Sequence, residues 1–322
     1  MKFSKLLLTA AVLFAGAPAF AQSYPSHPVK FISPFPPGTG IDIISRAVGD
    51  KLSPLLGQPV VVENRPGAGG TIGAAVVAKS APDGYTVLIQ SSSFTASPFL
   101  YSNLAYDTEQ DFAPVSMLAV LPQVLVVAPD SRFQIKSVKD LVAYGKAHPG
   151  QLNYASAGSG SATHMADEKF KVAAGLDAVH IPFKGTPEAM TDIMAGRVDY
   201  MFTPIVSAME LIKSGKLVAI AMGAEKRAPQ LPDIPTTAEA GVKNADYVFW
   251  AGMFLPSKTP KEIVDKLYQE TTKVLQSQEL KDRLATLGAE PWPMKPADLA
   301  ALVKRELKEN HELIKKAGIQ AN

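Results

Sequence analysis

Strand and helix patterns alternate along this chain, and this alternation restricts its fold more than any other feature. Short apolar runs at 29–32, 60–63 and 86–90 indicate strands, while 41–55 and 71–79 have the pattern of helices. Parallel strands need a crossover connection between them, which is usually a helix. The first part of the chain therefore predicts a mostly parallel sheet flanked by helices.

A second series of the same kind follows. One of its helices begins with the capping box Ser137-Val138-Lys139-Asp140, and another begins at about Thr163. The strands of this series are predicted at 124–127, 153–156, 198–202 and 218–222. Two series of similar size, with no flexible linker between them, predict two lobes joined by strands that cross from one to the other.

The chain is expected to return to the first lobe through a strand at 247–254, and the residues that follow are mainly helical, with helix starts at Thr259-Pro260 and Pro296. The expected bounds are 22–123 and 248–322 for the first lobe and 124–247 for the second. Ligands of open α/β sheets bind beyond the carboxyl ends of the strands. The loops of the two lobes should therefore face each other across a cleft.

Residues 1–21 have the features of a cleavable export signal. Lys2 and Lys5 precede an apolar run over 6–16, and Ala19-Phe20-Ala21 is the small-x-small pattern that precedes a cleavage site. The apolar run is too short to span a bilayer. We expect a soluble mature chain that begins near Gln22, in the periplasm if the host is Gram-negative.

Composition argues against several classes of partner and cofactor. The formal net charge is +2, and Lys2 and Lys5 of the export signal account for it, so the mature chain is formally neutral. Neutrality argues against nucleic acid or an anionic membrane as a partner. The chain has no cysteine, and its five histidines show no metal-ligand spacing, so we expect neither a metal nor a cofactor.

A loop rich in glycine and proline, Ser33 to Asp42, lies between the first predicted strand and the first predicted helix. It leads into a helix start, where N–H groups have no intrahelical acceptor and the helix dipole is positive. Such a start favours negative charge, so we expect an anion site here. Asp42 would itself repel an anion, and we interpret it as a helix cap or a holder of water.

Three more loops follow predicted strands: Asn64 to Thr71, Ser91 to Thr95 and Ala157 to His164. Their small residues let a backbone approach another group closely, and their hydroxyl groups can donate to a carboxylate. Each loop also has a plainer interpretation, as a tight turn or a solvated serine turn. Because the third loop belongs to the second lobe, loops on opposite lobes could together hold two carboxylates.

Motifs for catalysis and for cofactor binding are incomplete. Gly158-Ser159-Gly160 lacks the third glycine and the following acid of a dinucleotide site, and it is not a nucleophile elbow. Lys184-Gly185-Thr186 lacks the upstream glycine of a phosphate-binding loop. His164 could act as a base for Ser161, but the sequence identifies no orienting acid. We therefore expect a protein that is not an enzyme.

Several motifs, in one order, give the chain a resemblance to a known family. They are Tyr24-Pro25, Pro34 to Gly38 with Asp42 and Arg46, Glu63 to Gly70, Pro82 to Thr86, Gly158 to Gly160 with His164, Pro182 to Gly185, Gly196 to Asp199, Pro235-Thr236 with Glu239 to Gly241, and Pro256 with Thr259-Pro260. With them, the chain resembles the Bug-type periplasmic substrate-binding proteins of tripartite tricarboxylate transporters. The resemblance spans essentially the whole mature chain.

The resemblance implies a two-lobed periplasmic binding protein of type II, a Venus flytrap. Such a receptor captures a small organic anion, usually a carboxylate, through backbone N–H groups, hydroxyl groups and water, and presents it to the membrane permease subunits of the transporter. We expect a monomer that closes about a hinge. A sensor that reports a solute to a membrane receptor needs the same closed form, and an exported enzyme acting on small acids is a further alternative.

By the resemblance, both lobes supply ligand-binding residues. Those of the first lobe are Phe35, Gly38, Thr39, Gly40, Asp42, Ser91, Ser92 and Phe94, and those of the second lobe are Ser159, Ser161, Thr163 and His164. Thr203 and Trp250 complete the expected lining, Trp250 as a floor against the apolar part of the ligand. Thr39, Ile41, Phe94 and the shortened loop 186–188 depart from the usual pattern of the family, so the identity of the ligand stays open.

Overall fold

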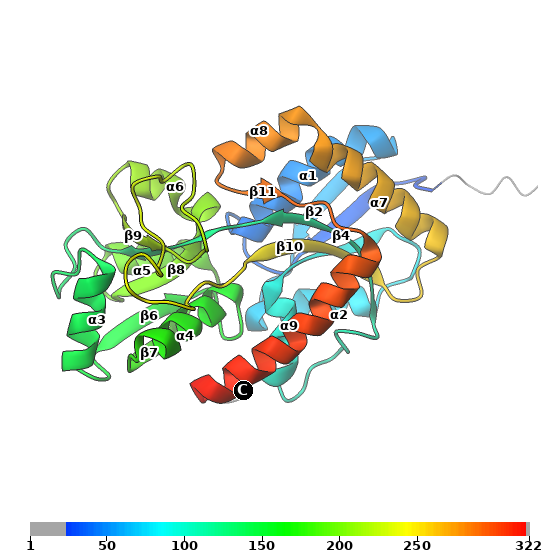
Figure 1. Cartoon of the computed structure of the whole chain (residues 1–322). Helices are drawn as coiled ribbons and strands as arrows, with labels where there is room; N and C mark the ends of the chain where they lie inside the picture. The colour runs from blue at the N-terminus through cyan, green and yellow to red at the C-terminus, as the bar shows by residue number, and fades with distance from the viewer. Residues whose placement is uncertain (1–23, 320–322) are drawn as a thin grey trace, which may run out of the picture.

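Two β-sheets, joined by two crossing segments, organise the computed structural model, which describes residues 24–319 (Figure 1). The export signal expected at 1–21 lies outside the described residues. The first lobe begins with β1 (Val29–Ser33), α1 (Gly40–Leu56), β2 (Val60–Asn64), η1 (Ala68–Gly70), α2 (Thr71–Ala78), β3 (Thr86–Ser91), η2 (Ser92–Thr95), η3 (Ser97–Phe99) and β4 (Phe112–Val120). After the chain returns from the second lobe, it adds β10 (Trp250–Pro256), α7 (Lys261–Gln276), α8 (Gln278–Thr286), β11 (Glu290–Pro291) and α9 (Pro296–Ala317).

The chain enters the second lobe after β4 and leaves it before β10. The second lobe contains β5 (Gln123–Val127), α3 (Val138–Ala147), β6 (Leu152–Ser156), α4 (Ala162–Ala174), β7 (Ala178–Pro182), α5 (Thr186–Met194), β8 (Tyr200–Pro204), α6 (Ile205–Lys213) and β9 (Val218–Met222). The N–H group of Leu121 donates to the carbonyl oxygen of Phe249 at 2.7 Å. The outgoing and the returning segments therefore run side by side between the lobes.

The sheet topology confirms the predicted two-lobed α/β fold. The strand order is β11-β4-β10-β3-β1-β2 in the first sheet and β7-β6-β8-β5-β9 in the second. β1 is parallel to β2 and β3, and β6 is parallel to β7 and β8, as helical crossovers require. β10 and β5 run antiparallel to their neighbours, because they are the strands by which the chain arrives from the other lobe.

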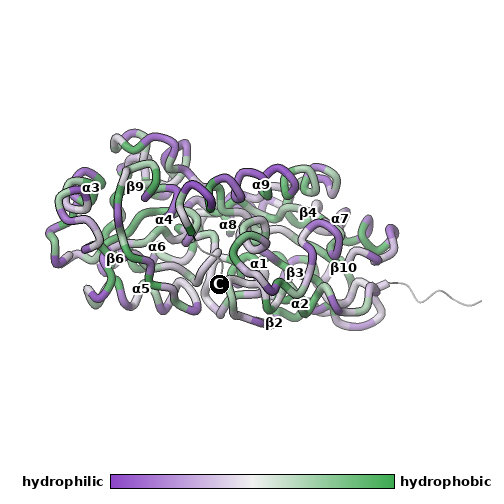
Figure 2. Tube along the Cα trace, turned by 90° about the horizontal axis from the view of Figure 1, so that it is seen from below, coloured by the Kyte–Doolittle hydropathy of each residue, from purple (hydrophilic) through white to green (hydrophobic). Residues whose placement is uncertain are grey.

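Hydrophobic side chains pack on both faces of each sheet. In the first lobe, Ile44, Val48 and Leu52 form one stripe of α1 and pack against Phe31 of β1. α2 and α9 cover the opposite face of the same sheet, while α3 and α4 cover one face of the second sheet and α5 and α6 the other. Figure 2 shows the outward-facing α9 as largely hydrophilic. Each sheet is thus covered by helices on both faces.

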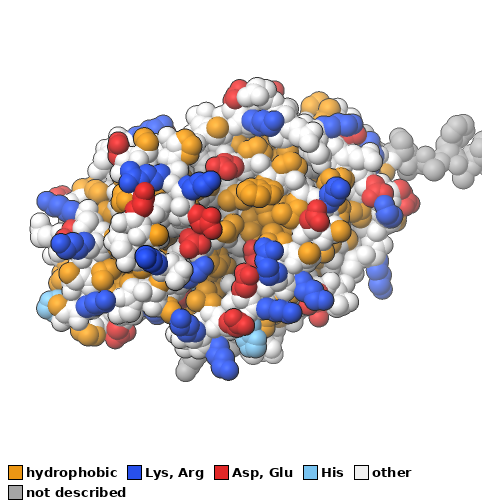
Figure 3. Space-filling model, viewed as in Figure 1, with side chains coloured by type: hydrophobic (Ala, Val, Ile, Leu, Met, Phe, Trp, Pro, Cys, Tyr) orange, Lys and Arg blue, Asp and Glu red, His pale blue; other side chains and the backbone are white. Residues whose placement is uncertain are grey.

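The surface carries charges of both signs. On the face seen in Figure 3, Lys and Arg side chains alternate with Asp and Glu, and apolar side chains gather near the middle of the face. No large area of one sign dominates this face. Among residues 24–319, no helix combines the length and the hydrophobicity that are needed to cross a membrane.

Helix α9 belongs to the first lobe but reaches the second (Figure 1). Near its end, Ile314 packs with Met165 of α4. Near its middle, the partly buried carboxylate of Glu306 accepts hydrogen bonds from Nε1 of Trp250 at 2.9 and 3.0 Å and from the hydroxyl group of Thr95 at 3.2 Å. Burial raises the pKa of Glu306 to about 7. This carboxyl group therefore keeps a proton, in the folded protein, at pH values where an exposed glutamate has lost it.

Glu306 should make the stability of the protein fall as pH rises from about 4.5 to about 7. In this window the folded state holds a proton that the unfolded state releases, so folding becomes less favourable with pH, by on the order of 3 kcal/mol over the window. Compared with the unmodified protein, Glu306→Gln should lose this contribution to the slope, whereas Glu312→Gln, on the exposed face of the same helix, should keep it. Urea unfolding at a series of pH values measures it, and an unchanged slope in Glu306→Gln would contradict the assignment.

Candidate ligand-binding site

A pocket lies between the lobes. Its empty volume is about 280 Å³, and the centre of a water molecule can occupy about 20 Å³ of this space. The lining residues are Phe35, Thr39, Gly40, Ile41, Ser91, Ala157, Ser161, Ala162, Thr163, Thr186, Pro204 and Phe249. They are glycine, apolar residues or residues with a hydroxyl group, and none is charged. An anion in this pocket would be held by dipoles and hydroxyl groups rather than by a salt bridge.

Three helices begin at the wall of this pocket. Gly40 and Ile41 lie in the first turn of α1, Ala162 and Thr163 in that of α4, and Thr186 is the first residue of α5. First-turn N–H groups have no intrahelical acceptor, and a helix N-terminus carries partial positive charge. Because α1 belongs to the first lobe and the other two helices to the second, an anion here would be stabilised from both lobes.

The start of α1 is fixed by its own lobe. Thr39 is the N-cap, and its hydroxyl oxygen accepts from the N–H group of Asp42. The carboxylate of Asp42 accepts from the N–H group of Gly38 at 3.0 Å, from Nδ2 of Asn64 at 2.8 Å and from Nε of Arg46 at 3.0 Å. Burial alone would raise the pKa of Asp42, but these bonds and the Arg46 charge lower it below its usual value. Asp42 thus binds its own loop, outside the pocket lining.

The start of α4 is fixed in a similar way by hydroxyl groups. Ser161 is the N-cap, and its oxygen accepts from the N–H group of His164 at 3.3 Å. The hydroxyl oxygens of Ser161 and Thr163 are 3.0 Å apart, and that of Thr163 accepts from the N–H group of Ala157 at 2.9 Å. These bonds connect the end of β6 to the helix and shape the wall that the second lobe contributes.

Thr186 offers a free hydroxyl group to the pocket. Its side chain is buried, and its oxygen has no hydrogen-bond partner within residues 24–319. A buried hydroxyl group without a partner is costly, so a ligand or water is expected to bind it. Thr186 is not among the residues predicted to bind the ligand, although the sequence analysis identifies its loop, 186–188, as a departure from the family pattern.

The structure brings six of the predicted ligand-binding residues together in the pocket: Phe35, Thr39, Gly40, Ser91, Ser161 and Thr163. The other predicted residues lie outside this lining. Gly38 is at the contact between the lobes, where a Cβ atom on it would lie 3.6 Å from Cγ of Pro187. Ser92 and Thr203 are fully buried, and His164 lies behind the loop that carries Ser161. Ser159 lines a neighbouring chamber.

Phe94 and Trp250 do not take the places expected for them. The ring of Phe94 packs in the core of the first lobe, with ring centroids 5.0 Å from those of both Phe112 and Phe254. Trp250 is fully buried in the same core and donates to Glu306. Successive residues of a strand point to opposite faces, so the neighbour Phe249 lines the pocket instead. Of the two adjacent aromatic residues, the structure thus places Phe249, and not Trp250, at the pocket.

A larger chamber adjoins the pocket and shares Phe35 and Ala157 with it. About 570 Å³ of it is open to water-sized molecules. Its remaining lining residues are Gly67, Ala68, Gly69, Gly70, Tyr101, Gly158, Ser159, Pro182, Phe183, Lys184 and Glu188. Unlike the pocket, this chamber has one cationic and one anionic side chain, Lys184 and Glu188. It therefore offers room and charge next to the uncharged pocket.

The lobes touch each other at the rim of this chamber. The hydroxyl group of Tyr101 donates to the carbonyl oxygen of Ser159 at 2.7 Å, across the two lobes. Gly69 comes so close that a Cβ atom on it would lie 2.4 Å from the same oxygen. Gly69 has φ +62°, in the left-handed region. A glycine is required here both by its conformation and by the close approach of the two backbones.

The described residues give no sign of a metal site. Within residues 24–319, no group of three or more His, Cys, Asp or Glu side chains is arranged to hold an ion. The polar groups of the pocket lining are hydroxyl and backbone groups only.

Comparison with known proteins agrees with this geometry. Residues 44–319 match the profile of the tripartite tricarboxylate transporter family receptor. Protein BugT of Bordetella pertussis is 34% identical over 324 residues, which cover 99% of this chain and 99% of that protein. The match to a receptor family extends across both lobes.

Solved structures show the same fold. The periplasmic binding protein BugD is 36% identical and aligns with a TM-score of 0.88 over 93% of this chain and 100% of that one. An R. palustris protein solved with adipate is 33% identical, with a TM-score of 0.89 over 93% and 100% of the two chains. MatC from Rhodopseudomonas palustris, solved with bound malate, is 34% identical, with a TM-score of 0.85 over 90% and 100%. The chain therefore belongs to the tripartite tricarboxylate transporter receptor family and is of its Bug type.

Proposed function

We propose that this protein is an extracytoplasmic solute receptor, which binds a small organic anion between its lobes and delivers it to the membrane subunits of a tripartite tricarboxylate transporter. The observation that carries the proposal is the meeting of three helix starts, from two lobes, at one uncharged pocket. The favoured ligand class is the carboxylates, which the adipate and malate in two solved relatives support. The export signal expected at residues 1–21 would bring the chain to the periplasm.

The two volumes suggest where each part of such a ligand binds. The pocket leaves about 20 Å³ open to the centre of a water molecule, and a site for one water needs roughly 10–15 Å³ on this measure. A single carboxylate group is of this order of size, whereas the chamber with about 570 Å³ takes a much larger group. In this proposal, one carboxylate occupies the pocket and the rest of the ligand extends into the chamber.

Thermal unfolding of the purified mature protein, with mono-, di- and tricarboxylates and aromatic acids, tests the proposal. A ligand at one hundred times its dissociation constant adds about 2.7 kcal/mol to the stability, so the midpoint should rise by several degrees. Neutral solutes of the same size serve as controls. A folded, ligand-free protein whose midpoint rises with none of the acids would refute the carboxylate assignment.

Capture of the membrane partner separates transport from sensing. The closed, ligand-bound protein is expected to bind the permease subunits in detergent more strongly than the ligand-free protein. Retention of a membrane signalling receptor instead would favour a sensor. Turnover of the bound acid, followed by mass spectrometry, would favour an enzyme.

A further inference from the structure

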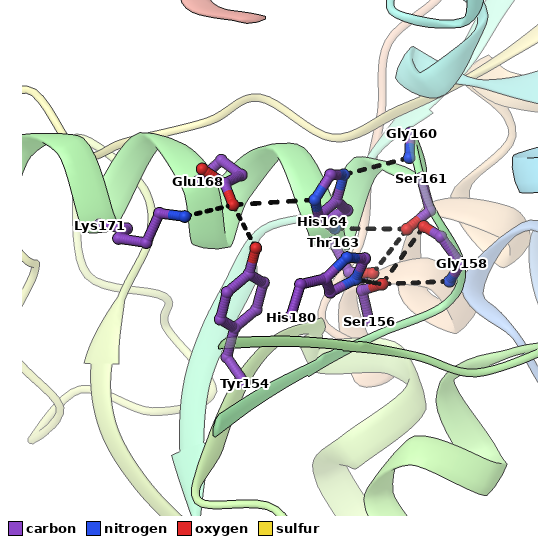
Figure 4. Close-up of polar contacts among 10 residues, drawn as sticks. All are labelled: Tyr154, Ser156, Gly158, Gly160, Ser161, Thr163, His164, Glu168, Lys171 and His180. Atoms are coloured by element: carbon purple, nitrogen blue, oxygen red, sulfur yellow. Dashed lines mark hydrogen bonds and ion pairs between the residues drawn. The ribbon is translucent and has the colours of Figure 1, made fainter. Parts of the chain in front are cut away.

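A cluster of titratable side chains lies behind the second-lobe loop of the ligand pocket (Figure 4). We call Tyr154, His164, Glu168, Lys171 and His180 the histidine cluster. His164, Glu168 and Lys171 come from α4, His180 from β7 and Tyr154 from β6. None of them lines the pocket. Their contacts with the loop, however, are specific.

The imidazole of His164 is hydrogen-bonded to the loop through one ring nitrogen. Its Nδ1 atom accepts a hydrogen bond from the N–H group of Gly160 at 3.1 Å, and the residue is only 2% exposed. Nδ1 can accept this bond only if it carries no proton. Gly160 immediately precedes Ser161, whose hydroxyl group caps α4 and lines the pocket. The orientation of the ring and the shape of the loop are therefore coupled.

The imidazole of His180 is hydrogen-bonded to the other end of the loop, at Ser156. Its Nε2 atom lies 2.6 Å from the hydroxyl oxygen of Ser156, which accepts from the N–H group of Gly158 at 3.2 Å. The rings of His164 and His180 stack, with centroids 4.0 Å apart and an angle of 19° between the planes. Tyr154 stacks on His180, with centroids 5.0 Å apart. The stack thus supports both ends of the loop at once.

We propose that His164 and His180 are positioning residues for ligand binding: through Gly160 and Ser156 they hold loop 156–163 in the shape that places Ser161 and Thr163 at the pocket. The proposal rests on the proposed function, because it concerns the same pocket. It assigns to His164 a place behind the wall of the pocket rather than a contact with the ligand.

Burial, together with the charge of Lys171, favours the neutral form of both imidazoles. Burial lowers the pKa of His164 well below its usual value, and the neighbouring His180 and Lys171 lower it further. Burial and Lys171 lower the pKa of His180 to about 4. The carboxylate of Glu168 lies 3.8 Å from Nε2 of His164, but its nearer partners are Nζ of Lys171, at 2.7 Å, and the hydroxyl group of Tyr154 (Figure 4).

The acceptor role of Nδ1 needs the neutral form, so a pH titration checks it. A further cavity, beside the histidine cluster, is lined by His164, Glu168, Lys171 and His180 of the cluster. From the end of α9 and the residues after it, Ala317, Gly318 and Ile319 also line this cavity and add no side-chain charge. In NMR spectra, the ring protons of His164 and His180 should keep their shifts from pH 8 to pH 5.5. Titration of the His164 ring near its ordinary value of about 6.5 would contradict a permanent acceptor at Nδ1.

The decisive test is a pair of variants at position 164. His164→Leu fills the space without an acceptor, and His164→Asn places an acceptor oxygen near the position of Nδ1. We expect His164→Leu to weaken the binding of the best carboxylate at least tenfold, measured by calorimetry, and His164→Asn to bind within about threefold of the unmodified protein. His148→Leu is the matched control and should bind normally.

Two further measurements keep the inference separate from the proposed function and from a folding defect. Hydrogen exchange of the Gly160 amide, without any ligand, should accelerate at least tenfold in His164→Leu relative to His164→Asn. Ser156→Ala removes the link to His180 and should also weaken binding. Normal affinity in His164→Leu would overturn the inference. If His164→Leu does not fold, normal affinity in Ser156→Ala would overturn it. If the unmodified protein binds no carboxylate at all, the proposed function is overturned instead.

Discussion

Gly40→Asp should lower the affinity for carboxylates at least a hundredfold. Gly40 is the first residue of α1 and lines the pocket, so the new carboxylate would lie where the ligand anion is expected to bind. A Cβ atom on residue 40 would also lie 2.8 Å from Cδ2 of Leu121 and 3.3 Å from Cγ of Pro204, at the junction of the lobes. The helix itself should persist, because an acidic residue is favourable in a first turn.

Gly40→Asn separates charge from bulk, since it has the same size without the charge. We expect Gly40→Asn to lose about tenfold in affinity through crowding alone, and Gly40→Asp to lose at least tenfold more, which is about 1.4 kcal/mol of repulsion. Calorimetric titration measures both, with circular dichroism to verify the fold. Equal affinities of the two variants would argue against an anion at the start of α1.

Gly69→Ala should impair closure of the lobes and reduce affinity at least tenfold. The new methyl group would meet the carbonyl oxygen of Ser159 at 2.4 Å, far inside van der Waals contact. The two backbones would have to separate, and the hydrogen bond from Tyr101 to Ser159 would lengthen with them. Small-angle scattering with saturating ligand should show a larger radius of gyration than that of the unmodified protein.

Gly57→Ala is the matched control for the strain of a left-handed backbone. Gly57 has φ +68°, close to the +62° of Gly69, but a Cβ atom on it would meet nothing within 4 Å. Both variants should lose about 1–2 kcal/mol of stability, because an L residue is strained in this conformation. Only Gly69→Ala should lose affinity. If both variants bind equally well, the contact between Gly69 and Ser159 is not part of the closed, ligand-bound form.

Much of the pocket could be predicted because its residues lie at junctions from strand to helix. Thr39 and Ser161 follow strand patterns and precede helical spacing, and both prove to be N-caps. Cap and turn chemistry depends on a few consecutive residues, so a sequence displays it directly. The parallel α/β class was predictable for the same reason, since hydrophobic periodicity is also local.

The choice between Phe249 and Trp250 was not predictable, because it depends on the phase of one strand. The strand was expected at 247–254 and is found as β10, Trp250–Pro256. Both residues are aromatic, so the apolar pattern does not reveal which of them faces α9 and which faces the cleft. A shift by one residue exchanges the two faces of a strand. The side chain of Trp250 is held on the α9 side by its hydrogen bonds to Glu306, which lies far along the chain.

By itself, the sequence determined the alternating α/β pattern, the two lobes and the loops at which helices begin, because periodicity, capping and turn chemistry act between near neighbours. The tertiary structure alone decided which of these loops meet. The order of strands in the second sheet brings Thr186 and Pro204 to the pocket beside Ser161, and the contact of the lobes brings Gly40 to them. The tertiary structure also stacks the ring of His180 on that of His164. Such meetings depend on long-range pairing of strands and lobes, which no short stretch of sequence encodes.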